Sequence, residues 1–252
     1  MMGVSNKNEV EISPNFRLIL PDQKRLRDAF NEILKRAGLV FEKSSPRAAQ
    51  GLTRDLKNRL PDIETYELRA DAALEWISDG AANMAIVGTD ILREFEAAGK
   101  ADDLPDQPRP LLSLPRISAC SLWIAAKPAV RIESLRDLQA LRIATSYPAL
   151  LQQLLQREDV RPARIIAQKG GVESTISAGR ADAILEIVET GASLDANGLE
   201  KKLLAFNSSA TLVRSNSKRP PAQEAMMEAF MQRIEEAATM RPYAAIARRG
   251  IF

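Results

Sequence analysis

The residues whose types and spacing could do chemistry gather in residues 181–199, which read ADAILEIVETGASLDANGL. Residues 183–188 form an apolar run that is long enough for one buried strand and holds a single charge, Glu186. Small and hydroxylic residues follow at 189–193, among them Gly191, which has no Cβ and can take a positive φ. A strand that opens through such a turn into a helix aims N–H groups and hydroxyls at one point, as phosphate-binding loops do. The alternative is an ordinary turn with a Thr or Ser cap.

The composition restricts the chemistry further, because the 252-residue chain has no histidine and one cysteine, Cys120. Ser-His and Cys-His catalytic pairs and an intrachain disulfide are therefore excluded, and a zinc site nearly so. Cys120 stands in the apolar run ACSLWIAA, where we expect it to be buried. The remaining carboxylates, cations, hydroxyls and amides favour group transfer from a phosphorylated substrate by charge stabilisation.

The charge and hydropathy of the chain predict neither nucleic acid nor a membrane as a partner. The net charge is only +2, and basic residues are scattered among acidic ones. The sequence contains neither an apolar run of about 18 residues nor the apolar region of a secretory signal. We therefore expect a cytoplasmic protein.

The patterns around these residues predict strands that alternate with helices. The expected strands are 16–20, 63–68, 83–87, 121–126, 142–144, 164–167, 183–188 and 210–213. The expected helices are 24–37, 71–79, 90–98, 134–141, 147–157, 172–178 and 222–238. This alternation is typical of an α/β protein with mainly parallel sheets, and the segment 102–110, rich in Pro and Asp, is expected to cross between two domains.

Five segments, in this order, resemble the ATP phosphoribosyltransferase family, whose members catalyse the first step of histidine biosynthesis. They are LPDQKRL at 20–26, ELRADAAL at 67–74, NMAIVGTDIL at 83–92, RIATSYPALL at 142–151 and the stretch 181–199. The resemblance implies a two-domain fold of the periplasmic-binding-protein type (type II), with a ligand cleft between the domains. Domain I would hold 16–103 and 192–252, domain II would hold 104–191, and 1–15 would be a disordered lead-in.

The resemblance also implies a reaction. The family joins N1 of ATP to C1 of phosphoribosyl pyrophosphate, with Mg²⁺ on the phosphates and pyrophosphate as the leaving group. The chain is similar to the short form, which lacks a C-terminal regulatory domain. It would therefore form a homo-oligomer, such as a dimer, and work with a regulatory subunit related to histidyl-tRNA synthetase.

Site residues follow from matched motif positions. Phosphoribosyl pyrophosphate would contact Glu186, Glu189, Thr190, Gly191, Ala192, Ser193 and Leu194, with Glu186 standing where the family has an Asp that faces the ribose hydroxyls. The leaving pyrophosphate would be neutralised by Arg69 and Arg54, whose alternative role is a surface ion pair. The nucleotide would be bound by Lys24, Arg25, Gly88, Tyr147 and Glu173. Lys24 could equally be a solvated residue at a helix start, and Tyr147 a packing aromatic.

The chain departs from the family pattern at four positions: Gln23, Lys24, Asn83 and Ser121. These residues replace a lysine, a glycine, an aspartate and an arginine, respectively. Two other functions therefore stay open. One is a diverged phosphoribosyltransferase that uses another purine nucleotide, and the other is a non-catalytic protein of the same fold that binds an anionic metabolite.

Overall fold

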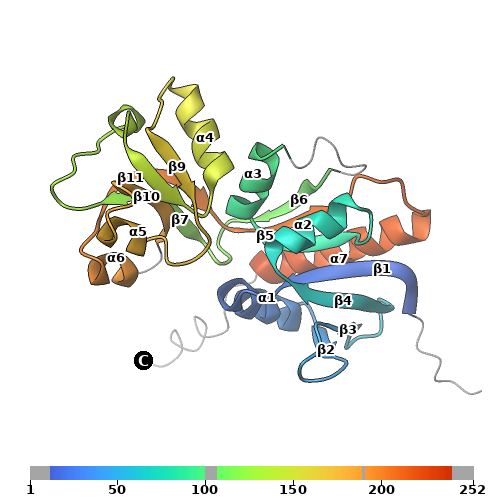
Figure 1. Ribbon diagram of the computed structural model, residues 1–252. Coiled ribbons are helices and arrows are strands. Elements are labelled where there is room, and N and C mark those ends of the chain that lie inside the picture. Colours follow the sequence, from blue (N-terminus) through green and yellow to red (C-terminus); the bar gives the residue numbers. More distant parts are fainter. Residues whose placement is uncertain (1–11, 100–106, 189–190, 240–252) are drawn as a thin grey trace, which may run out of the picture. The chain divides into compact units, whose positions relative to one another are not determined.

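The computed structural model describes residues 12–99, 107–188 and 191–239 (Figure 1). The expected lead-in up to residue 11, the start of the 102–110 crossing, Glu189, Thr190 and the tail from 240 lie outside these residues. The chain folds into two compact units. Unit 1 contains the described parts of Met1–Ile86, Asp106–Ile117 and Thr211–Phe252, and unit 2 those of Val87–Pro105 and Ser118–Ala210.

Unit 1 is built on a seven-stranded sheet with the order β2-β3-β4-β1-β5-β12-β6. Its strands are β1 (Ile12–Pro21), β2 (Leu39–Lys43), β3 (Gln50–Asp55), β4 (Asp62–Leu68), β5 (Met84–Gly88), β6 (Arg109–Leu114) and β12 (Ala210–Arg214). Its helices are α1 (Lys24–Arg36), α2 (Ala70–Ser78) and α7 (Pro221–Thr239). Helix α1 contacts β1, β2 and α7, and α2 contacts β1.

Unit 2 is built on a five-stranded sheet with the order β11-β7-β10-β8-β9. Its strands are β7 (Cys120–Ala126), β8 (Arg142–Thr145), β9 (Arg164–Ala167), β10 (Ala183–Val188) and β11 (Glu200–Ser208). Its helices are α3 (Thr89–Ala97), α4 (Pro148–Arg157), α5 (Ser174–Ser177), α6 (Ala192–Ala196) and a 3-10 turn at Leu135–Leu138.

Both sheets are mixed, although the alternating pattern favoured mainly parallel strands. Strand β1 is parallel to β4 and β5, and β8 is parallel to β9 and β10. The hairpin β2–β3 adds antiparallel strands beside β4, and β7 lies antiparallel between β10 and β11. The α/β class is confirmed, and both sheets contain antiparallel strands that the pattern did not predict.

The compact units divide the chain at positions that differ from the expected boundaries. The chain returns to unit 1 at 211 rather than 192, because β11 pairs with β7 and therefore continues the second sheet. Helix α3 belongs to unit 2, because it packs on α4 and β11. Strand β1 begins at Ile12, within the segment that was expected to be a disordered lead-in.

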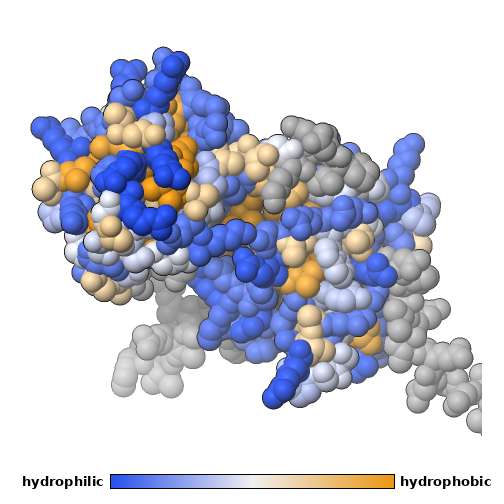
Figure 2. Space-filling model, in the orientation of Figure 1, coloured by the Kyte–Doolittle hydropathy of each residue, from blue (hydrophilic) through white to orange (hydrophobic). Residues whose placement is uncertain are grey.

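The buried residues match the apolar patterns. Helix α7 buries Met226, Met227, Phe230, Ile234 and Ala237. Cys120 is also buried, as its apolar surroundings predicted. Hydrophilic residues cover much of the face in Figure 2, and the exposed large hydrophobic residues among the described ones are Leu56 and Leu204. Among the helices of the described segments, none combines the length and the apolar character that crossing a membrane requires.

Candidate functional site

The carboxyl ends of three parallel strands in unit 2 bring the strongest candidate residues together. The register aligns Leu185 of β10 with Thr145 of β8, and Thr145 with Ala167 of β9. The next residues along the three strands are Glu186, Ser146 and Gln168, which form one row at this edge of the sheet. Ligands of open α/β sheets bind at such carboxyl ends.

The Glu186 carboxylate is largely buried in this row and is held by two donors. Ser146 donates its hydroxyl to Oε2 at 2.8 Å, and the N–H of Ile187 donates to Oε1 at 2.9 Å. Burial raises the pKa of Glu186 most strongly, and the charges of Glu173 and Asp90 raise it further, against the lowering effect of the two hydrogen bonds. Glu186 is thus a carboxylate with a fixed orientation, and its remaining lone pairs can accept hydrogen bonds from hydroxyl groups.

A second acid reaches the same edge from the turn before α5. The hydroxyl of Ser193 donates to Glu173 Oε1 at 2.5 Å. This turn has positive φ angles at Gly170 and Gly171, and the side-chain amide of Gln168 donates to both of their carbonyls, at 3.1 and 2.9 Å. The structure therefore brings two residues from distant parts of the sequence, Glu173 and Ser193, into direct contact.

The predicted phosphate loop is described from Gly191 onward, and Glu189 and Thr190 lie outside the described residues. Gly191 has φ +88° and precedes α6, so the positive φ that the sequence suggested is present. Ala192 and Ser193 form the first turn of α6 with exposed side chains. The Leu194 side chain is buried in the core of unit 2 and so faces away from solvent.

Tyr147 and Gly88 take part in a buried network around the start of α3. The Tyr147 hydroxyl donates to Asp90 Oδ2 at 2.7 Å, and Ser208 donates to Asp90 Oδ1 at 2.5 Å. Burial and the Asp90 carboxylate raise the pKa of Tyr147. A Cβ at Gly88 would lie 2.2 Å from Asp90 Oδ1, so a larger residue would displace the carboxylate. The Tyr147 ring is 4% exposed, as a packing aromatic would be.

Cationic candidates lie at the corresponding edge of unit 1. The register pairs Pro21 at the end of β1 with Leu68 at the end of β4, so the turn with Lys24 and Arg25 is next to Arg69. Arg69 is exposed and pairs only loosely with Asp71, at 3.4 Å between Nε and Oδ1. Lys24 is also exposed and donates to Asp28 at 2.7 Å, whereas Arg25 is half-buried.

Arg54, the other candidate for pyrophosphate, lies on β3 and is held by neighbouring strands. Its Nη1 donates to Glu42 of β2 at 2.7 Å, and its Nε donates to Asp62 of β4 at 3.1 Å. This arrangement is the cross-strand ion pair that the sequence left open as the alternative.

Comparisons with known proteins give these edges a context. A family model described as HisG, ATP phosphoribosyltransferase, matches residues 69–236, which is more than half of the chain. The chain belongs to the ATP phosphoribosyltransferase family. It is therefore an enzyme of this type, a transferase of histidine biosynthesis.

Solved structures agree with this assignment. A chain of the ATP phosphoribosyltransferase (HisG:HisZ) complex from Thermotoga maritima is 25% identical with a TM-score of 0.64, over 88% of this chain and 98% of that chain. The aliphatic sulphonate binding protein SsuA from Escherichia coli is 16% identical with a TM-score of 0.53, over 90% of this chain and 69% of that chain. XAC2383 from Xanthomonas citri, bound to ATP, is 13% identical with a TM-score of 0.52, over 93% of each chain. The last two matches show the fold alone.

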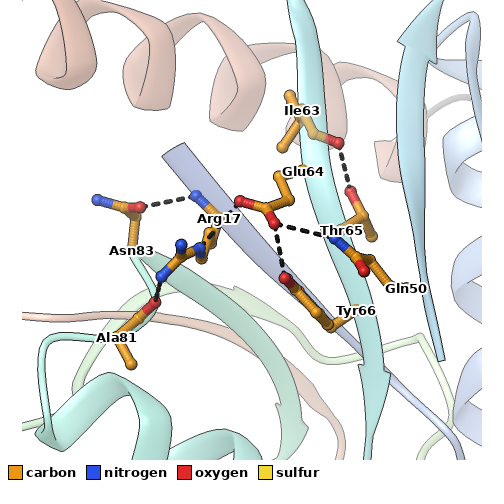
Figure 3. A network of polar contacts seen from close by, with 8 residues as sticks. All are labelled: Arg17, Gln50, Ile63, Glu64, Thr65, Tyr66, Ala81 and Asn83. Carbon is orange, nitrogen blue, oxygen red and sulfur yellow. Dashed lines mark hydrogen bonds and ion pairs between the residues drawn. The ribbon is translucent and has the colours of Figure 1, made fainter. Parts of the chain in front are cut away.

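One departure of this ATP phosphoribosyltransferase from the family pattern lies far from the candidate edges. Asn83 precedes β5, at the opposite end of the first sheet from Arg69, and its Oδ1 accepts the N–H of Arg17 at 2.7 Å (Figure 3). The Arg17 guanidinium in turn donates to Glu64 at 2.9 Å and to the carbonyl of Ala81 at 3.2 Å. Asn83 thus holds two strands together and removes no charge from the edge with Arg69.

The departure at Ser121 lies close to the edge of unit 2 that carries Glu186. Ser121 pairs with Val188 at the end of β10 and donates its hydroxyl to Asn207 at 2.8 Å. A neutral pair therefore stands where the ATP phosphoribosyltransferase pattern has an arginine.

Sequence reasoning did not single out Ser146, Gln168 and Asp90. Ser146 and Asp90 both lie in motifs that carry the resemblance, RIATSYPALL and NMAIVGTDIL. The signal that could have found Ser146 and Gln168 was a polar residue directly after each parallel strand, because such residues share one edge of the sheet.

Proposed function

We propose that this chain transfers the phosphoribosyl group from phosphoribosyl pyrophosphate to N1 of ATP and releases pyrophosphate. The observation that best supports the proposal is the edge of unit 2. There Glu186 lies in a row with Ser146, and Gly191 has a φ of +88°. A carboxylate with free lone pairs suits the ribose hydroxyls, and a turn without a Cβ suits the 5′-phosphate.

The chemistry needs little proton transfer, so a chain without histidine is sufficient. Charge develops as a ribosyl cation forms and pyrophosphate leaves, and catalysis consists of holding the ribose phosphate and neutralising the leaving group. In this proposal Glu186 binds ribose, and Gly191, Ala192 and Ser193 bind the 5′-phosphate, together with Glu189 and Thr190. Arg69 neutralises pyrophosphate, because a guanidinium binds phosphate oxygens in bidentate fashion.

In this proposal Mg²⁺ arrives bound to the phosphate groups of the substrates. The described residues contain no cluster of three or more acidic, histidine or cysteine side chains that would cage a metal ion. Mg²⁺ commonly uses substrate phosphates and water together with one or two carboxylates. In this proposal Mg²⁺ is therefore held by the phosphates of the two substrates.

The proposed partners follow from the Thermotoga chain, which comes from a HisG:HisZ complex and is matched over 98% of its length. We propose that this protein also works in the cytoplasm as a homo-oligomer with a HisZ-like subunit related to histidyl-tRNA synthetase.

The test is product formation. Purified protein is mixed with ATP, phosphoribosyl pyrophosphate and Mg²⁺, with and without a HisZ-like subunit, and the products are separated and identified by mass. Phosphoribosyl-ATP and equimolar pyrophosphate are expected. Binding of either substrate without turnover under all conditions would favour the non-catalytic binding protein.

The neutral Ser121–Asn207 pair favours testing a second candidate, a phosphoribosyltransferase with another purine nucleotide as acceptor. The same assay with a panel of purine nucleotides distinguishes the two. A product from another nucleotide at a higher kcat/KM than that with ATP would replace ATP as the acceptor.

A further inference from the structure

The hydroxyl of Ser146 lies between two neighbouring strands and contacts both. Ser146 directly follows β8, and its Oγ lies 2.8 Å from Oε2 of Glu186 on the neighbouring strand β10 and 3.1 Å from the carbonyl oxygen of Gln168, which follows β9. A hydroxyl has one proton, so it donates fully to one of these acceptors at a time. An ionised carboxylate is the stronger acceptor, because charge-assisted hydrogen bonds are about twice as strong as neutral ones.

The backbone on both sides of Ser146 is fixed by buried side chains. The Thr145 hydroxyl donates to the carbonyl of Leu185 at 2.7 Å and accepts the N–H of Tyr147 at 2.9 Å. Tyr147 is in turn anchored by its hydroxyl on Asp90. Removing the Ser146 hydroxyl should therefore leave the backbone of this row in place.

Glu186 needs such a contact, because its side chain has one more methylene than the aspartate of the family pattern. In the structure it folds back onto its own strand, so that Oε1 accepts the N–H of Ile187 at 2.9 Å. The Ser146 hydroxyl holds the second oxygen, and each oxygen keeps a lone pair for a further donor. A free glutamate would lose rotamer entropy when a ligand orders it, and a held one has already lost it.

We propose that Ser146 is a positioning residue that holds the Glu186 carboxylate in the orientation that receives the ribose hydroxyls of phosphoribosyl pyrophosphate. This inference rests on the proposed function. It assigns to Ser146 a task that an aspartate at position 186 would need less, because the shorter side chain has fewer orientations to lose.

The contact also affects the ionisation of Glu186, which gives a measurement that needs no substrate. Burial and the charges of Glu173 on the turn before α5 and Asp90 on α3 raise the pKa of Glu186, whereas the donors Ser146 and Ile187 lower it. When Glu186 is neutral, Ser146 can turn its proton to the carbonyl of Gln168. Loss of the hydroxyl therefore costs the ionised form more than the neutral form, and the pKa of Glu186 must rise.

The experiment compares Ser146→Ala, Ser146→Thr and Ser177→Ala in the full chain. Ser177 is a matched control, because its exposed hydroxyl donates only within its own turn, to the carbonyl of Ser174 at 2.9 Å. The pKa of Glu186 is followed by the ¹³C shift of its labelled carboxyl carbon, and calorimetry gives the Kd for phosphoribosyl pyrophosphate. We expect S146A to raise this pKa and to weaken binding about fivefold, as for one hydrogen bond. S146T should restore both quantities, and S177A should change neither.

A second comparison tests the reason for the contact. In a Glu186→Asp background, S146A should weaken binding less than in the wild type, since the shorter carboxylate depends less on Ser146. An unchanged pKa in S146A, or a raised pKa with unchanged binding, would overturn the positioning role. Wild-type protein that does not bind phosphoribosyl pyrophosphate would overturn the proposed function, and the pKa shift would still show whether Ser146 holds Glu186.

Discussion

Gly191 and Glu186 divide the work that the proposed phosphoribosyl site requires. Glu186 supplies fixed acceptors, because Ser146 and the N–H of Ile187 each hold one of its oxygens. Gly191 supplies a backbone turn that few residues can form, since its φ is +88°. Neither role depends on a titrating base, which is consistent with a chain that contains no histidine.

Gly191→Val should abolish detectable binding of phosphoribosyl pyrophosphate while the protein stays folded. A Cβ there would meet no atom within 4 Å, so the cost comes from the left-handed backbone, about 1–2 kcal/mol, and from a branched side chain where the phosphate approaches. Gly198→Val is a matched control, with φ +63° and equally open surroundings after α6. Calorimetry should show binding in the control only. Near-normal binding in folded G191V would remove the loop from the site.

Glu173→Gln should tighten the binding of phosphoribosyl pyrophosphate about two- to fivefold, the scale of an exposed charge interaction. Ser193 now donates its only hydroxyl proton to Glu173, and a phosphate oxygen must compete for it. The exposed Glu158→Gln at the end of α4 is the control. Calorimetric titration with phosphoribosyl pyrophosphate measures this effect. Weaker binding of ATP by E173Q, titrated in the same way, would instead support the predicted nucleotide contact of Glu173.

Arg69→Ala should lower kcat more than it raises KM, because the guanidinium meets pyrophosphate as charge builds up. We expect a loss of about 10²- to 10³-fold in kcat, as for one donor to a developing anion. The exposed Arg93, whose Nη1 lies 3.3 Å from Glu96, provides the control Arg93→Ala. Steady-state activity within a factor of two of wild type would make the Arg69–Asp71 pair a surface salt bridge only.

Among the elements, those with a clear apolar period were predictable from the sequence, and the exposed strands were not. Strand β10 and helix α1 were expected at nearly their observed bounds. The hairpin β2–β3 and strand β11 were missed, because half-exposed strands with several charges lack a continuous apolar run. The pairing of Ser146 with Glu186 and of Ser193 with Glu173 depends on sheet register and loop geometry, which sequence spacing alone does not give.

Within unit 1, the ion pair of Arg233 with Asp55 joins helix α7 to strand β3. The carboxylate of Asp55 is buried and also accepts the N–H groups of Lys57, Arg59 and Leu60 at 2.8–3.0 Å. Burial alone would raise the pKa of Asp55, but Arg233 and these N–H groups outweigh it and hold the pKa well below its usual range. The ionised pair therefore joins α7 to the end of β3.

Arg233→Ala should lower the free energy of unfolding by about 3 kcal/mol at neutral pH, because it leaves a buried carboxylate without its cation. The depressed pKa makes this stabilisation complete above the unfolded pKa of about 4, and it is lost as the pH falls toward the folded pKa. The difference between wild type and R233A should therefore shrink in acid, which urea unfolding at several pH values measures. Arg214→Ala, which breaks a half-buried pair with Glu224, should cost less. A difference that is constant with pH would contradict the ion-pair account.

At the scale of the whole molecule, the two units present different chemistry at the carboxyl ends of their strands. The edge of unit 1 carries the cations Lys24 and Arg25, which suit the phosphates of the nucleotide, and Arg69, which suits pyrophosphate. The edge of unit 2 carries Glu186 and the turn at Gly191, which suit ribose and its phosphate.

The most direct test of the account is the rate at which phosphoribosyl-ATP forms from ATP, phosphoribosyl pyrophosphate and Mg²⁺, measured for wild type, G191V and G198V with a HisZ-like subunit present. The account predicts product from wild type and from G198V and none from G191V. Equal rates for the two glycine variants, or no phosphoribosyl-ATP from the wild type, would contradict it.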